Sequence, residues 1–184
     1  MPLCRQVIRH SSYAIRAVHR QEFDRADELL HSARDLLDEV GQIIIDGKEL
    51  GYTGFVRDAQ KEFAEGSLTL IMVIGKPLPG PDDLGIDPAA YLNGLGEAVG
   101  ELRRYLLDGV RKGNLSRSEE LLSAMDDIYN ILVTMDFPDA ITGGLRRTTD
   151  MVRGVLERTR SDLTLVMRQT DLENRLGKFE EELQ

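Results

Sequence analysis

The chain is poor in cysteine and has no long apolar run. Cys4 is its only cysteine, which excludes an intrachain disulfide and favours a reducing compartment. No neighbouring histidine or aspartate would activate this thiol, so we expect it to be inert. The longest apolar stretch, residues 68–74, is far shorter than the about 20 residues that cross a bilayer, and no secretory signal opens the sequence. We therefore expect a cytoplasmic protein with no membrane partner.

Aromatic residues are also scarce. Tryptophan is absent and aromatics make up 5% of the chain, whereas hydrophobic residues make up 41%. A core built mainly from Leu, Ile, Val and Ala is typical of a helical bundle. The formal net charge of -9 argues against a protein that coats nucleic acid with its whole surface, but it leaves room for a local basic face.

Apolar residues recur every three or four positions through nearly the whole chain, which predicts α-helices. One seam begins after Asp87 and Pro88, which suit an N-cap and a first helical turn, and it ends at Gly113. Ser116 and Glu119 have the spacing of a capping box for the next helix. The predicted helices cover residues 1–21, 22–46, 53–74, 88–112, 116–133 and 142–170.

Two segments interrupt this helical pattern. Three prolines within residues 76–83 exclude a helix interior, so we predict a surface loop over about residues 76–87 that joins two halves of one bundle. Residues 136–139 form a second break. The acidic tail, residues 171–184, is predicted to be a frayed and solvated end. The fold predicted for residues 1–184 is a single all-α domain, an antiparallel bundle of six or seven helices.

The N-terminal helix is basic in a chain that is acidic overall. Its first 21 residues contain four arginines and no acidic residue. At about 100° per residue the arginines project within roughly 60° of one another. Such a row suits the phosphate oxygens of a nucleic-acid backbone, although a solvated face paired with acidic neighbours explains it equally well. The residues concerned are Arg5, Arg9, Arg16 and Arg20, with His19 close to the same face.

Two helices each carry a pair of glutamates at helical spacing. Glu62 and Glu65 are three residues apart, and Glu65 lies on the face continued by the apolar residues 68 and 72. A carboxylate on such a face needs a partner, a proton or a metal ion. Glu97 and Glu101 are four residues apart, opposite the leucine seam of their helix, with Arg104 one turn later. Taken alone, this second pair is more typical of a solvated face.

Taken together, the four glutamates are candidates for a Mg²⁺ or Mn²⁺ site with oxygen ligands. Such a metal activates water and neutralises charge on a phosphodiester. The same spacings are common in acidic helical proteins, so a site without metal stays an alternative. The chain has no P-loop, dinucleotide fingerprint, H-E-x-x-H or nucleophile signature. Its helical glycines 94, 96 and 100 are expected to permit close helix packing rather than to cradle phosphate.

The residues around these glutamates resemble the translin family. Residues 91–104 (YLNGLGEAVGELRR) and the preceding residues 61–65 (KEFAE) are similar to that family's core region. Residues 145–151 (LRRTTDM) are similar to its C-terminal region, and the basic opening helix followed by residues 22–24 (EFD) also fits. The likeness extends over nearly the whole chain. It is stronger to the translin-associated factor X branch than to translin itself, and it is of the kind expected for a compact archaeal or prokaryotic relative.

The resemblance implies an all-α fold of about seven helices and an RNA-cleaving activity. Glu62 and Glu65 match the E-x-x-E pair of the catalytic branch. Glu97 stands where that branch typically has aspartate, which keeps the charge on a longer side chain, and Glu101 matches the glutamate four residues later. The resemblance also implies a closed oligomer such as an octamer, built from one kind of subunit, with RNA held inside.

Three hypotheses follow for the function. The first is a Mg²⁺-dependent endoribonuclease for single-stranded RNA, in which Glu62, Glu65 and Glu97 hold the metal and Glu101 supports them. The second is a translin-like shell that binds RNA or DNA without cleaving it. The third is a structural helical adaptor that binds no nucleic acid. In the first two, the RNA backbone is gripped by Arg5, Arg9, Arg16, His19, Arg20 and Arg104.

Overall fold

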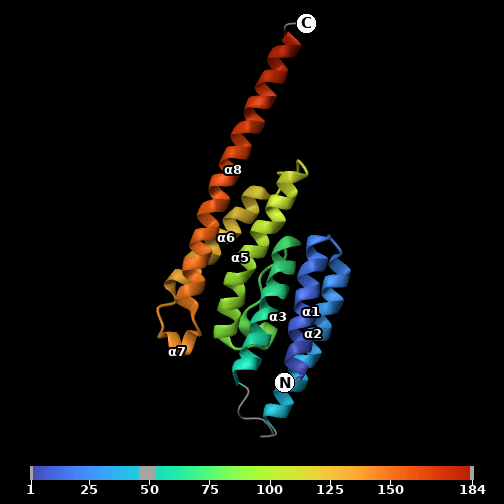
Figure 1. Ribbon diagram of the computed structural model, residues 1–184, viewed down its shortest axis with the longest axis vertical. Helices are drawn as coiled ribbons and strands as arrows, with labels where there is room; N and C mark the ends of the chain where they lie inside the picture. Colours follow the sequence, from blue (N-terminus) through green and yellow to red (C-terminus); the bar gives the residue numbers. More distant parts are fainter. Residues whose placement is uncertain (1, 46–52, 183–184) are drawn as a thin grey trace.

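The computed structural model describes residues 2–45 and 53–182, and within these ranges the chain is helical with no strand (Figure 1). The all-α expectation is confirmed. The described residues contain six long helices and two short ones: α1 (Pro2–His19), α2 (Phe23–Ile45), α3 (Thr53–Val73), α4 (Pro81–Leu84), α5 (Pro88–Arg111), α6 (Ser118–Thr134), α7 (Asp139–Thr142) and α8 (Leu145–Glu182).

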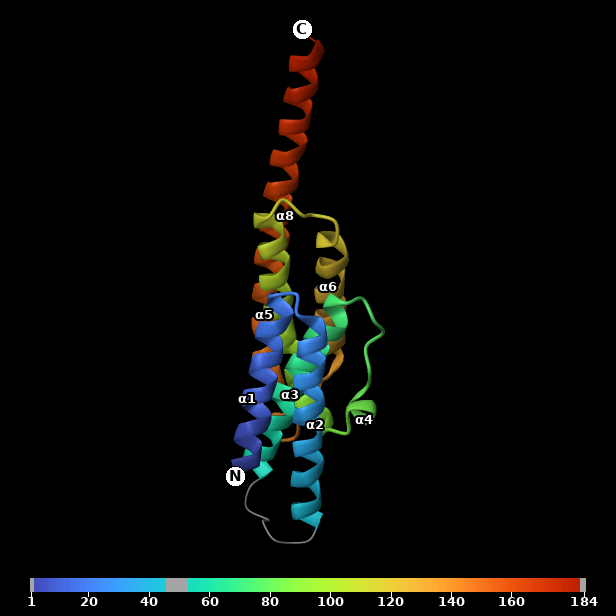
Figure 2. The ribbon, with the colours of Figure 1, turned by 90° about the vertical axis from the view of Figure 1, so that its right-hand side faces the viewer.

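The helices form two up-down-up groups that meet along α3 and α5. Helices α1 and α2 pack with α3, and α6 and α8 pack with α5. The chain after α3 returns along the bundle to α4 before α5 begins (Figure 2). As a result α3 and α5 are parallel, and the expected purely antiparallel arrangement is wrong for this pair. Gln60 lies beside Asp87, and further along both helices in the same direction Ala64 lies beside Gly94.

The helix starts were only partly predicted. Asp87 caps α5 as expected, because its Oδ1 accepts hydrogen bonds from the amides of Ala89 and Ala90. The capping box predicted at Ser116 is wrong. Helix α6 begins at Ser118, and the Ser116 hydroxyl instead donates a hydrogen bond to Asn114. The predicted loop 76–87 is confirmed as an irregular connection, but it contains the single turn α4.

The core is aliphatic, as the composition predicts. Its largest fully buried side chains come from all six long helices, and they include Leu68 of α3, Leu102 of α5, Ile128 of α6 and Leu163 of α8. Cys4 is also buried in it, 2% exposed, which agrees with an inert thiol. None of the described helices is both long and apolar enough to cross a membrane.

Helix α8 differs most from expectation. The predicted end near residue 170 and the frayed tail are both wrong, because α8 continues to Glu182. Residues 171–182 are rich in Leu, Glu, Arg and Lys, which favour the helix. Leu163 is the last buried residue of α8, and beyond it the helix extends away from the rest of the bundle (Figure 1).

Candidate metal site and basic surfaces

Close contact between α3 and α5 positions the candidate site. A Cβ atom built on Gly94 would lie 2.6 Å from the Ala64 Cβ and 2.6 Å from the Lys61 carbonyl oxygen. Only glycine lets the two backbones approach this closely. A Cβ on Gly96 would likewise lie 2.3 Å from Thr148 of α8. The packing role expected for these two glycines is therefore confirmed, whereas Gly100 has no described neighbour within 4 Å of such a Cβ.

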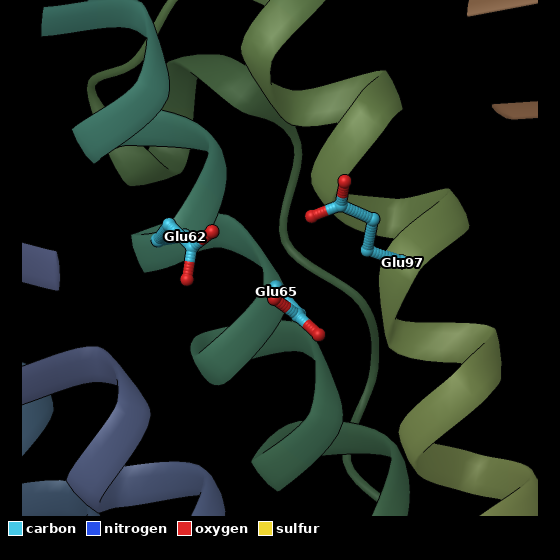
Figure 3. A group of neighbouring side chains, drawn as sticks. All are labelled: Glu62, Glu65 and Glu97. Atoms are coloured by element: carbon cyan, nitrogen blue, oxygen red, sulfur yellow. The ribbon is translucent and has the colours of Figure 1, made fainter. Parts of the chain in front are cut away.

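Three glutamates converge beside this contact. Glu62 and Glu65 lie on α3, Glu97 lies on α5, and one carboxylate oxygen from each lies within 4.8 Å of the others (Figure 3). All three side chains are partly buried. Two glutamates three residues apart share one side of α3, and the parallel packing brings Glu97 to meet them. The structure thus brings together three of the four predicted ligands.

Lys61 is an unpredicted member of this cluster. Its Nζ lies 2.7 Å from Oε1 of Glu97 and 3.9 Å from Oε1 of Glu62. Burial lowers the pKa of Lys61, but the hydrogen bond to Glu97 and the surrounding carboxylates outweigh this effect and raise the pKa overall. The ammonium group therefore stays charged and offsets part of the negative charge of the cluster. In the sequence, the position of Lys61 directly before Glu62 is what indicates that it lies near the cluster.

Glu65 lies in the least favourable environment for a negative charge. Burial is the main reason that its pKa rises to about 8, and Glu97 and Glu62 raise it further. Burial also raises the pKa of Glu62, against the opposing effect of Lys61. This confirms the inference that Glu65 does not face open water. Without a cation, Glu65 holds a proton at neutral pH; a divalent cation would replace that proton.

Glu101 is engaged elsewhere. Its Oε2 lies 2.5 Å from Nε2 of His19 and 3.8 Å from Arg104, and it does not belong to the three-carboxylate cluster. The hydrogen bond to His19 is the main cause that lowers the pKa of Glu101. The His19 side chain is only 6% exposed. It therefore ties α1 to α5 rather than offering itself to RNA, which departs from the role expected for it.

The predicted arginines lie at the surface. Arg5, Arg9 and Arg16 are exposed along α1, Arg20 is exposed directly after it, and the Arg104 side chain is 58% exposed. Arg16 also lies over the Tyr13 ring, 5.7 Å from its centroid. The contact between His19 and Glu101 places the C-terminal end of this row of arginines against α5, one turn from Glu97.

A cleft that the sequence analysis did not predict adjoins the glutamates, and three basic and two acidic side chains are among its lining residues. It has a volume of about 410 Å³, and Arg57, Lys61, Glu97 and Arg147 are among its lining residues. Asn93 forms part of its wall, where it binds the Thr142 carbonyl and accepts a hydrogen bond from Thr148. Arg57 and Lys61 are four residues apart on α3, so the sequence indicates that they share one side of this helix. Arg147 comes from α8, and only tertiary packing reveals its place here.

Comparison with known proteins gives relatives over almost the full length of the chain. No family model matches it. An uncharacterized protein of Methanocaldococcus jannaschii is 28% identical over 185 residues, which cover 98% of this chain and 80% of the relative. The solved structure of AfC3PO in complex with duplex RNA is 32% identical, with a TM-score of 0.84 over 91% of this chain and 87% of that one. The chain belongs to the translin family.

Two further C3PO structures agree with this assignment. A second structure, the crystal structure of AfC3PO, has the same identity and coverage, with a TM-score of 0.83. The apo form of NeC3PO is 20% identical, with a TM-score of 0.77 over 90% of this chain and 88% of that one, and it supports the fold alone. The resemblance read from residues 61–65 and 91–104 is thereby confirmed at the level of family and fold.

Proposed function

We propose that this translin-family protein is a Mg²⁺- or Mn²⁺-dependent endoribonuclease, with Glu62, Glu65 and Glu97 as its metal ligands. The observation that carries the proposal is the convergence of these three carboxylates from two helices within 4.8 Å. Glu101 lies one turn beyond Glu97 on the same helix. In this proposal it is not a metal ligand, and it supports the site by binding His19 and so holding α1 against α5.

The donor set fits such a cation. Magnesium and manganese prefer carboxylate oxygens, and a protonated Glu65 with a pKa of about 8 is a group whose charge a cation would stabilise. A bound divalent cation would stabilise negative charge on the phosphate and lower the pKa of an attacking water. Glu65 and Glu62 would then be held ionised.

The basic side chains next to the glutamates would hold the RNA backbone. Arg57, Lys61 and Arg147 line the cleft beside Glu97, and guanidinium groups suit phosphate oxygens. The exposed arginines of α1 and Arg104 of α5 would add further contacts to the RNA backbone. We propose single-stranded RNA as the substrate, held inside a closed oligomer of this chain such as an octamer. Because AfC3PO was solved with duplex RNA, duplex RNA is the matched comparison substrate.

A second function, RNA binding without cleavage, is favoured by the position of Lys61. Its ammonium lies 2.7 Å from Glu97, so the cluster already has a counter-ion of its own. In that case the glutamates would be a neutralised structural cluster, and the arginines alone would carry the function. The structural adaptor stays the third candidate.

Cleavage of end-labelled RNA separates these functions. Single-stranded and duplex RNA are incubated with the protein in Mg²⁺, in Mn²⁺ and in chelator, with Glu65→Gln and Glu97→Gln beside the wild type. Glu39→Gln, an exposed residue of α2, is the matched control. The nuclease requires cleavage that is lost in chelator and in both site variants but kept in the control. Retention that weakens steeply with salt, without cleavage in any metal, establishes the binding shell instead. No retention at low salt leaves the adaptor.

A further inference from the structure

The turn that joins α7 to α8 is held against α5 by one buried side chain. Asn93 of α5 is 6% exposed. Its Nδ2 donates hydrogen bonds of 2.8 Å to the carbonyl oxygens of Ala89 and Thr142, and its Oδ1 accepts a hydrogen bond of 2.7 Å from the Thr148 hydroxyl. Thr142 ends α7 and Thr148 lies in the first turn of α8. One amide group therefore fixes both sides of the turn.

This tie uses every hydrogen-bonding group of the Asn93 amide. A side-chain amide has two N–H donors and an acceptor oxygen, and each has a partner here. Because removal of one partner would leave a buried polar group without a hydrogen bond, other arrangements of the turn are disfavoured. The turn is thus held in a single position relative to α5.

The backbone of the turn and its contact with α5 are equally specific. Gly143 and Gly144 have φ angles of 61° and 91°, in the left-handed region that favours glycine. The Cγ2 atom of Thr148 lies where a side chain on Gly96 would be, 2.3 Å from a Cβ built there. Gly96 directly precedes Glu97. The start of α8 is therefore anchored beside the glutamate cluster.

Arg147 is the side chain whose position depends most on this turn. It is exposed, and among the described residues no carboxylate forms an ion pair with it. It lines the cleft beside Glu97, and it also lines a second cleft between α6 and α8. No contact of the guanidinium group itself selects one cleft over the other. The backbone beneath Arg147 makes this selection, and Asn93 holds that backbone.

We propose that Asn93 is a positioning residue for RNA binding, which keeps Arg147 in the cleft beside the glutamates so that it binds a phosphate of the RNA strand. Gly143 of the same turn lies against Arg57, with 3.5 Å between the arginine Nη1 and a Cβ built on the glycine. The turn thus holds guanidinium groups from α3 and α8 in one cleft, where their planar donors suit phosphate oxygens. The proposal rests on the proposed function in that RNA occupies this cleft.

A purely structural role for Asn93 makes a different prediction. In that case the loss of Asn93 would destabilise the bundle, and its effect on RNA binding would add to the effect of losing Arg147. If Asn93 acts through Arg147, the two effects do not add, because the second change removes a contact that the first has already lost. A double-mutant cycle therefore separates the two roles.

Retention of labelled single-stranded RNA in chelator measures this cycle without any cleavage. The chains compared are the wild type, Arg147→Met, Asn93→Ala and the double variant, each over a range of salt concentrations. Both single variants should bind RNA about tenfold more weakly, the effect of one lost charge-assisted contact. The slope of log affinity against log salt should fall by about 0.7, as for one phosphate contact to a single strand. The double variant should bind no more weakly than Arg147→Met.

Thr148 supplies a milder version of the same test. Thr148→Val removes the hydroxyl that binds Asn93 but keeps the methyl group against Gly96, and it should weaken RNA binding about threefold. In the Arg147→Met chain the same change should have no further effect. Thr148→Ser keeps the hydroxyl and should restore binding. Thr149→Val is the matched control, because the Thr149 hydroxyl donates to the Leu145 carbonyl within α8 and should not affect RNA.

Two outcomes would overturn the proposal: additive losses in the double variant, or an unchanged salt slope in Asn93→Ala. Circular dichroism checks that each variant is folded, and a Mn²⁺ titration should give the wild-type affinity in all of them. If Asn93→Ala does not fold, the comparison of Thr148→Val with Thr148→Ser decides. A wild-type chain that retains RNA but never cleaves it contradicts the proposed nuclease alone, whereas a chain that retains no RNA overturns both proposals.

Discussion

The two acidic regions of the molecule contain the same residue type in opposite settings. At the α3–α5 contact, Glu62, Glu65 and Glu97 converge from two helices and are partly buried. In the last turn of α8, residues 180–182 are three glutamates in a row that are exposed to water. The pKa of Glu65 rises to about 8, whereas solvent screens the charges of the tail. Convergence and burial, rather than the number of carboxylates, make one region a candidate for chemistry.

The largest expected effect comes from separating α3 and α5. Gly94→Val places side-chain atoms where Ala64 and the Lys61 carbonyl already lie, and such overpacking costs about 1–3 kcal/mol or more. Urea unfolding should show this loss, and Mn²⁺ binding to the folded variant should weaken at least about tenfold because Glu97 moves from Glu65. Gly100→Ala is the control, since its Cβ meets no described neighbour within 4 Å. It should be neutral or stabilising by up to about 1 kcal/mol.

The second effect is a pH dependence of stability that the tail cannot produce. Because the pKa of Glu65 is raised from 4.5 to about 8 in the folded protein, its contribution is fully present below pH 4.5 and is lost as pH rises toward 8 and beyond. Metal-free protein should lose about 1–3 kcal/mol of unfolding free energy across this window. Glu65→Gln should flatten the profile. An unchanged profile in this variant would contradict the burial of the carboxylate.

Metal binding should show the opposite pH dependence. A divalent cation replaces the proton of Glu65, so its affinity should rise by up to about tenfold per pH unit between pH 6 and 8. Calorimetry in buffers of different ionisation enthalpy measures the proton released. Glu65→Gln should bind weakly and release none. Proton release by that variant would assign the titration to another group.

A smaller effect is expected from Lys61. Replacing it with methionine keeps the stem but removes the ammonium 2.7 Å from Glu97. Affinity for Mn²⁺ should rise about tenfold, because the cation no longer competes with an internal positive charge. Affinity for RNA should fall, because the same side chain lines the cleft. If the Lys61→Met chain binds Mn²⁺ no better than the wild type, Lys61 does not act as the counter-ion of the site.

The smallest effect is expected in the acidic tail. Glu181→Gln should change the free energy of unfolding by less than about 0.5 kcal/mol and leave Mn²⁺ binding unaltered. The residue is exposed at the end of α8. Thermal unfolding and a Mn²⁺ titration measure both quantities, and a change as large as that of Glu65→Gln would remove the contrast between the two regions.

Several elements of the fold followed from local chemistry. Asp87 and Pro88 start α5 as the sequence predicts, because a cap needs only the adjacent backbone amides. The capping box predicted at Ser116 rested on the same kind of local reasoning, but it is wrong. The Ser116 hydroxyl donates its hydrogen bond to Asn114 instead of capping a helix. The predicted end of α8 near residue 170 is wrong, because residues 171–182 are rich in Leu, Glu, Arg and Lys, which favour the helix.

The helical period and the spacing of Glu62 and Glu65 on one side of α3 were determined by the sequence alone, since neighbours within one helix follow from its repeat. The meeting of Glu97 with that pair, the placing of Lys61 between them and the diversion of Glu101 to His19 were decided only by tertiary structure. The physical reason is that these contacts join residues 32 to 82 positions apart. Their distances depend on how closely Gly94 lets two helices approach and on the connection that makes them parallel.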